Sequence, residues 1–68
     1  MEKQVFRSQK LREIRRKQGL TLQDLSAKSS VSFSVISAYE IGAIANHSIE
    51  IVRRLEKALR VKKGILFQ

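Results

Sequence analysis

Residues 21–40 read TLQDLSAKSSVSFSVISAYE and have the pattern of two short helices joined by a tight turn. Thr21 and Asp24 have the spacing of a capping box, in which the Thr21 side chain accepts a backbone N–H of the first helical turn and the Asp24 side chain accepts the Thr21 N–H. A run of serines then competes for local backbone hydrogen bonds and interrupts the helix, and Ser32 is placed to cap the next one. We therefore predict one helix from residue 22 to residue 28 or 29, and a second over residues 33–40.

A strand is the alternative for part of this stretch. SVSFSVIS, residues 30–37, alternates polar and apolar side chains, and β-branched Val35 and Ile36 favour extended backbone. We favour the helix because the neighbouring segments are helical in pattern and a single strand would have no partner.

Further helical patterns flank the central stretch. An apolar stripe containing Leu11 and Ile14 predicts a helix over residues 8–18, which Gly19 would end in a left-handed conformation. After Ser48, a capping serine, the chain shows its clearest amphipathic pattern. The predicted inward residues are Ile51, Val52, Leu55, Ala58 and Leu59, and the predicted outward residues are Arg53, Arg54, Glu56, Lys57 and Arg60.

Two roles are open for the last apolar residues, Ile65, Leu66 and Phe67. Gly64 weakens any helix there, so these side chains could remain exposed and form a dimer interface. They could equally close the core of the monomer itself. The sequence leaves both alternatives open.

Charge is unevenly distributed along this chain of 68 residues, which is long enough for one small domain. The net charge is +8, yet residues 29–48 contain neither lysine nor arginine. A basic balance points to an anionic partner, with nucleic acid ahead of an acidic membrane surface. Cysteine is absent and no apolar run is long enough to cross a bilayer, so we expect a cytoplasmic protein without a membrane span.

Catalytic and metal-binding patterns are lacking. The carboxylates fall on separate predicted helices or beside cations, and no glycine-rich loop suited to a nucleotide occurs. His47 is the single histidine, so no histidine–cysteine cluster can be assembled. We expect no enzyme activity, no cofactor, no metal site and no small-molecule ligand.

Over residues 11–59 the sequence resembles the phage Cro/repressor type of helix-turn-helix domain, also called the XRE family. The residues that carry the resemblance are Leu11-Arg12, Arg15, Gly19-Leu20-Thr21, Asp24-Leu25, Val31-Ser32, Ile36, Glu40 and Gly42, then Leu55, Ala58 and Leu59. Ser30 and Arg60 stand where the family usually has glycine, and Ser30 would then need a left-handed backbone. The resemblance implies one all-α domain over residues 1–68: a compact five-helix lambda-repressor-like bundle with its motif at about residues 21–40. Residues 1–7 would form a flexible arm.

The resemblance also implies site residues on the third helix, which would enter the major groove. The implied base-reading residues are Ser32, Phe33, Ser34, Ser37 and Ala38. Arg15 and Glu40 would form an ion pair between the first and third helices. Phosphates would be contacted by cations and by backbone N–H groups, some of them at a helix N-terminus. The candidate phosphate-contacting residues are Lys3, Arg7, Lys10, Leu22, Gln23, Lys28, Asn46 and His47.

These observations predict a DNA-binding transcriptional regulator, a repressor or a switch protein of a phage or mobile element. It would bind a palindromic double-stranded operator as a homodimer and reside at the nucleoid. The alternative is a protein-interaction module on the same fold, such as an antirepressor or antitoxin-like partner binder, because the third helix carries small and apolar side chains. A basic peptide on a membrane surface is a third class, which the capped helical pattern disfavours.

Overall fold

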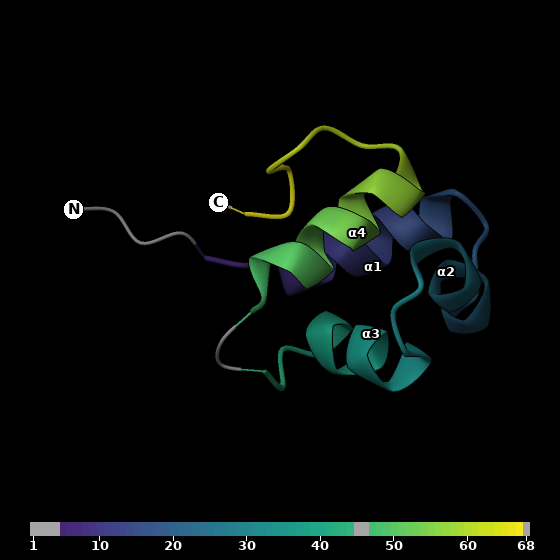
Figure 1. Cartoon of the computed structure of the whole chain (residues 1–68), viewed down its shortest axis with the longest axis horizontal. Coiled ribbons are helices and arrows are strands. Elements are labelled where there is room, and N and C mark those ends of the chain that lie inside the picture. Colours follow the sequence, from purple (N-terminus) through teal and green to yellow (C-terminus); the bar gives the residue numbers. More distant parts are fainter. Residues whose placement is uncertain (1–4, 45–46, 68) are drawn as a thin grey trace.

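The computed structural model describes residues 5–44 and 47–67 of the chain. It contains four helices in the order α1 (Ser8–Lys17), α2 (Leu22–Ser29), α3 (Phe33–Glu40) and α4 (Ile49–Leu59). The predicted all-α fold is confirmed, and the strand alternative for residues 30–37 is wrong because this segment lies across the α2–α3 turn and α3. In Figure 1, α3 lies on one side of α4, and the segment that follows α4 lies on the other.

Side-chain caps determine where three of these helices begin. The Thr21 hydroxyl accepts the Asp24 N–H at 3.0 Å, and the Asp24 carboxylate accepts the Thr21 N–H at 3.0 Å, which completes the predicted capping box of α2. Ser32 accepts the Ser34 N–H at the start of α3, and Ser48 accepts the Ile51 N–H at the start of α4. The hydrogen bonds with Thr21 lower the pKa of Asp24 below its ordinary value.

Two helices end at non-glycine residues in the left-handed region. Ser30 follows α2 with φ 60°, and Arg60 follows α4 with φ 58°. A left-handed backbone places Cβ close to the following carbonyl oxygen, so each position is strained relative to glycine. Gly19, with φ 72°, ends the first helical segment without that strain.

The core is formed by apolar side chains from every helix. Leu11, Leu25, Ile36, Leu55 and Leu59 are all fully buried. Tyr39 joins them from α3, and its hydroxyl accepts the Ser48 N–H at 3.2 Å, which fixes the start of α4 against the end of α3. Because α2 packs on both α3 and α4, the motif and the longest helix share one interior.

The prediction of five helices is wrong for the described residues. After α4, residues 60–67 form turns, in which the Ile65 N–H bonds to the Lys62 carbonyl and the Phe67 N–H to the Gly64 carbonyl. Gly64 itself has φ 89°, which is incompatible with a continuous right-handed helix. We call residues 60–67 the C-terminal tail.

Glu56 explains how this tail is held. The prediction that Glu56 faces outward is wrong, because its exposed fraction is 2%. Its Oε2 accepts the Gly64 N–H at 2.9 Å and the Leu66 N–H at 3.1 Å. Leu66 is thereby fully buried, so of the two alternatives for the tail its apolar residues close the core of the monomer.

The segment before α1 packs against the same tail. Phe6 is buried and pairs with Phe67 in an isolated β-bridge, and the Arg7 N–H bonds to the Leu66 carbonyl at 2.6 Å. Of the predicted arm over residues 1–7, residues 1–4 lie outside the described part of the chain, whereas Phe6 and Arg7 belong to the packed domain.

Candidate nucleic-acid interface

The N-terminal end of α3 offers an open, uncharged surface. Ser32, Phe33 and Ser34 are exposed, and Ser37 and Ala38 are half-buried. Phe33 is the most conspicuous of them, since 49% of this large apolar residue remains accessible. The structure thus places the five base-reading candidates on α3 and its N-cap, with hydroxyl groups and apolar carbons as their available chemistry.

Arg15 fixes how α3 sits on the domain. Its guanidinium donates to both carboxylate oxygens of Glu40, from Nε to Oε2 at 2.6 Å and from Nη2 to Oε1 at 3.0 Å. Nη1 donates to the Leu20 carbonyl at 2.7 Å. One side chain therefore joins α1, the loop before α2 and the end of α3. The hydrogen bond to Glu40 raises the pKa of Arg15 above its ordinary value.

The first turn of α2 lies beside the start of α3. Leu22 and Gln23, two phosphate-contact candidates, occupy that first turn, where the backbone N–H groups are not used by the helix. A surface hollow connects this turn to Phe33. It is lined by Arg15, Arg16, Gly19, Leu20, Thr21, Leu22, Gln23 and Phe33. The first turn of α2 and an exposed aromatic ring thus line the same hollow.

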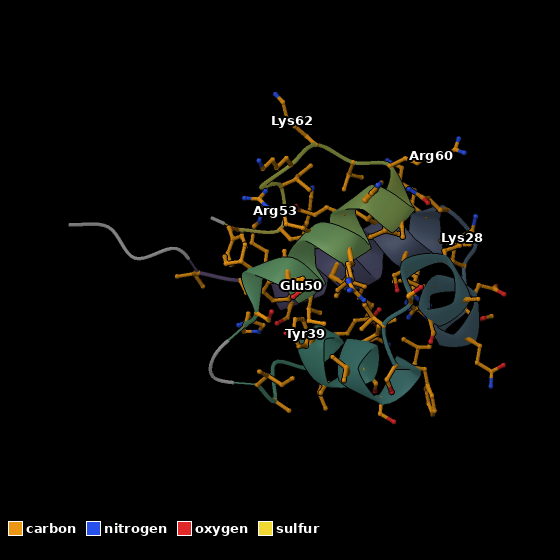
Figure 2. All side chains as sticks on the ribbon, in the orientation of Figure 1. Lys28, Tyr39, Glu50, Arg53, Arg60 and Lys62 are labelled. Carbon is orange, nitrogen blue, oxygen red and sulfur yellow. The ribbon has the colours of Figure 1, made fainter. Side chains whose placement is uncertain are left out.

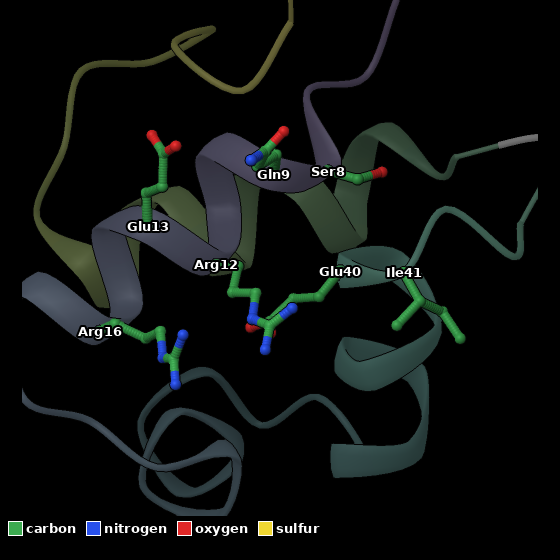
Figure 3. A pocket seen from close by; sticks show the side chains of 7 residues that line it. All are labelled: Ser8, Gln9, Arg12, Glu13, Arg16, Glu40 and Ile41. Atoms are coloured by element: carbon green, nitrogen blue, oxygen red, sulfur yellow. The ribbon is translucent and has the colours of Figure 1, made fainter.

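Two arginines of α1 were missed as site candidates. Figure 3 shows Arg12 and Arg16 projecting from α1 toward α2 and α3, whereas Gln9 and Glu13 project to the other side. Both arginines are exposed. Their spacing could have revealed them, because Arg12 and Arg16 lie four residues apart, next to Arg15, on the helix side that faces Glu40.

Among the described residues, the other phosphate-contact candidates do not lie at this surface. Lys3 and Asn46 lie outside the described residues. Arg7 and Lys10 line a separate hollow with Glu13. Lys28 lies at the opposite end of α2 from Leu22 and Gln23, and it shares a hollow with α4.

His47 packs into the domain. Its ring stacks on Phe6 with centroids 4.2 Å apart and meets Tyr39 edge-on at 4.9 Å. The Nε2 atom is buried and has no hydrogen-bond partner among the described residues. This burial lowers the pKa of His47, because a charged imidazolium is disfavoured away from water.

Other kinds of site find no support in the described part of the chain. Residues 5–44 and 47–67 contain no group of three or more histidine, cysteine or acidic side chains that could hold a metal ion. No helix within these ranges is both long enough and apolar enough to cross a membrane.

Comparison with known proteins agrees with this geometry. A family profile described as helix-turn-helix matches residues 11–66. Two solved structures are similar, each with 27% sequence identity: a SinR protein/SinI protein complex, and SinR, the master regulator for biofilm formation, in complex with DNA.

The fold likeness to both is close. The TM-score to the SinR–SinI complex is 0.82, over 88% of this chain and 58% of that chain, so the domain spans little more than half of that protein. The TM-score to DNA-bound SinR is 0.81, over 87% of this chain and 94% of that chain. No curated protein matches the sequence significantly. On the profile match, which extends from α1 through the C-terminal tail, this chain belongs to the helix-turn-helix family of the XRE type.

Proposed function

We propose that this protein is a sequence-specific, double-stranded-DNA-binding transcriptional regulator that inserts α3 into the major groove. The observation that carries the proposal is the exposed end of α3, held by the Arg15–Glu40 pair beside the free N–H groups of α2. Family membership and the likeness to a DNA-bound regulator support it. The protein would act as a repressor, as two copies on a palindromic operator, in the cytoplasm at the nucleoid, and without enzymatic chemistry.

Base reading would come from Ser32, Ser34 and Ser37, together with Phe33 and Ala38. Serine hydroxyls bond several base edges, and the two apolar side chains suit the methyl group of thymine. Side chains able to make bidentate pairs with guanine or adenine are absent from α3. We therefore expect direct readout to contribute about 1–2 kcal/mol per contacted base pair at most, with a further share from DNA shape.

Phosphate contacts would come from two neighbouring elements. The N–H groups at Leu22 and Gln23 offer a helix N-terminus to one phosphate. Arg12 and Arg16 project on the same side of the domain and would neutralise others. Phosphate contacts position a protein on DNA without specifying sequence, so the uncharged N-terminal end of α3 and the cationic α1 would have separate tasks.

Selection of bound fragments from random duplex DNA tests this function and returns the operator and its symmetry. Exchanging Phe33 for Ala should then lower the ratio of operator affinity to random-duplex affinity, whereas Arg12→Gln should weaken both and reduce the salt dependence of binding. Equal losses on operator and random duplex for Phe33→Ala would remove Phe33 from base reading. An operator without inverted symmetry would argue against the dimer.

The alternative function is binding of a protein through α3. It is favoured by the exposed ring of Phe33 and by the absence of any cation in α3. Undetectable binding to long duplex DNA at low salt would select this alternative over DNA recognition, because non-specific DNA binding depends on phosphate neutralisation.

A further inference from the structure

A second basic surface lies away from α3 and from the first turn of α2. It combines the end of α2 with the outer side of α4 and the C-terminal tail, and Figure 2 shows Arg53, Arg60 and Lys62 on the side of α4 that faces away from α3. We call this surface the rear basic face. Its cations are Lys28, Arg53, Arg54, Lys57, Arg60, Lys62 and Lys63.

Most of this positive charge has no partner in the described part of the chain. Arg54 pairs with Glu50 at 3.0 Å. Arg53 approaches the buried Glu56 at 3.6 Å, which is within ion-pair range but beyond hydrogen-bond distance. The other five cations of the rear basic face form no salt bridge with any described residue. The proposed DNA contacts lie on α1, on the first turn of α2 and on α3, so they leave this charge unneutralised as well.

The rear basic face is also hollowed. One hollow is lined by Arg53, Glu56, Lys57, Val61 and Lys63, and a second by Lys28, Ser29, Arg54, Lys57 and Ala58. Lys57 stands between them and lines both. Val61 and Ala58 are half-buried, so each hollow offers apolar carbon between cationic side chains. Lysine and arginine stems add further apolar area along the rims.

We propose that the rear basic face binds an acidic amphipathic segment of a protein partner. Carboxylates of such a segment would meet the five unpaired cations, and its apolar side chains would enter the hollows beside Val61 and Ala58, as an amphipathic helix enters a groove. A DNA backbone would match the charge but would gain nothing from the apolar carbon. A second copy of this chain would bring like charges together.

Phage-displayed random peptides provide the probe. Peptides selected on the whole protein should combine Asp and Glu with apolar residues at helical spacing. Binding of an enriched synthetic peptide should shift the amide resonances of α4 and the tail and spare those of α3. The peptide should remain bound when operator duplex is added in excess. Peptides without this pattern, no enrichment, shifts centred on α3, or displacement by DNA would each overturn the proposal.

A matched pair of charge reversals sharpens the assignment. Lys57→Glu should lower the affinity for the enriched peptide about tenfold. Lys17→Glu, the same change on α1, should change that affinity by no more than about twofold. Replacing the apolar residues of the peptide by serine should lower its affinity by a similar factor, because charge alone does not fill the hollows. Equal effects of the two reversals, or an unaffected serine peptide, would contradict the proposal. Operator affinity of Lys57→Glu, measured in parallel, reports on the proposed DNA function independently.

Discussion

Glu40 and Glu56 are buried carboxylates that each hold two segments together, in two different regions of the molecule. Glu40, at the end of α3, is held by the side chain of Arg15 on another helix. Glu56, inside α4, accepts main-chain N–H groups of Gly64 and Leu66. Both carboxylates are almost completely buried, and the exposed fractions of the side chains alone are 5% for Glu40 and 3% for Glu56. The Glu40 carboxylate fixes the orientation of α3, and the Glu56 carboxylate holds the non-helical C-terminal tail against α4.

The difference between their partners shows which buried carboxylates can be predicted from a sequence. A side-chain pair has two partners that residue type identifies, and the family resemblance implied the pairing of Arg15 with Glu40. A carboxylate bound by backbone N–H groups has no partner that can be recognised by residue type. In both places, removing one member leaves a buried polar group without its hydrogen bonds, which costs more than the bond itself contributes.

The largest effect is expected at Glu56. Glu56→Ala removes the acceptor of the buried Leu66 N–H and of the partly buried Gly64 N–H, and it removes the anion nearest to Arg53, so the free energy of unfolding should fall by roughly 3 kcal/mol. For a domain of this size that is a large part of the total stability. Urea unfolding followed by circular dichroism measures the loss.

Glu56→Gln is the matched control, because its amide oxygen can still accept one or both N–H groups. It should lose clearly less than Glu56→Ala. An alanine variant that is as stable as the wild type would show that the tail does not depend on this carboxylate.

The corresponding test of the α3 region uses Arg15→Met, Glu40→Leu and the double variant. Each single change leaves one partner with few hydrogen bonds in a mostly buried position and should cost about 2 kcal/mol, while the double variant should cost less than the sum. Thermal unfolding of the four proteins gives the coupling energy. Additive losses would mean that the two side chains stabilise the fold independently.

The two strained helix ends offer a pair of stabilising changes, one per region. Ser30→Gly and Arg60→Gly remove the Cβ from left-handed backbones and should each raise the free energy of unfolding by about 0.5–1 kcal/mol. Urea unfolding midpoints report the gain. Ala27→Gly, in the right-handed interior of α2, is the control and should destabilise. A loss at either strained end would indicate that the native side chain makes compensating contacts.

The smallest effect concerns pH. Burial keeps the pKa of His47 below its ordinary value of 6.5, so the unfolded chain takes up this proton at a higher pH than the folded one. Stability should therefore decrease as pH falls through about 6.5, and the loss is complete below the folded pKa. Asp24 affects stability in a separate pH range. Its pKa is lowered in the folded state, so its contribution to stability is lost as pH falls below the ordinary value of 3.8.

Melting temperatures of wild type and His47→Gln between pH 7.5 and pH 5 check this expectation. The variant should show the weaker dependence on pH, because it lacks the titrating ring. Identical slopes would assign the pH dependence to other groups.

The helix-turn-helix region was predictable because its signals are local. Thr21, Ser32 and Gly19 mark helix ends through their own hydrogen bonds or backbone preference, and α3 has the predicted bounds. The C-terminal region was not predictable in the same way. Glu56 has an outward position in the repeat of α4 and becomes buried only because the tail folds back over it, which is a contact formed after the helix has ended.

The candidate site was predictable in part. The five positions on α3 and its N-cap follow from the family resemblance, and the structure leaves Ser32, Phe33 and Ser34 exposed and Ser37 and Ala38 partly buried. The cations could not be assigned from charge alone, because any lysine or arginine suits a phosphate. Placement of Lys28 beside α4 and of Arg12 beside α3 depends on how the helices pack.

The bridge between Phe6 and Phe67 has a practical consequence for engineering. Because the main chain at Arg7 and Leu66 is hydrogen-bonded, both ends of the packed domain leave it at neighbouring points. A short glycine–serine linker between them would close the backbone into a ring without altering α2 or α3. Such cyclisation restricts the unfolded ensemble and so should raise the melting temperature of the domain.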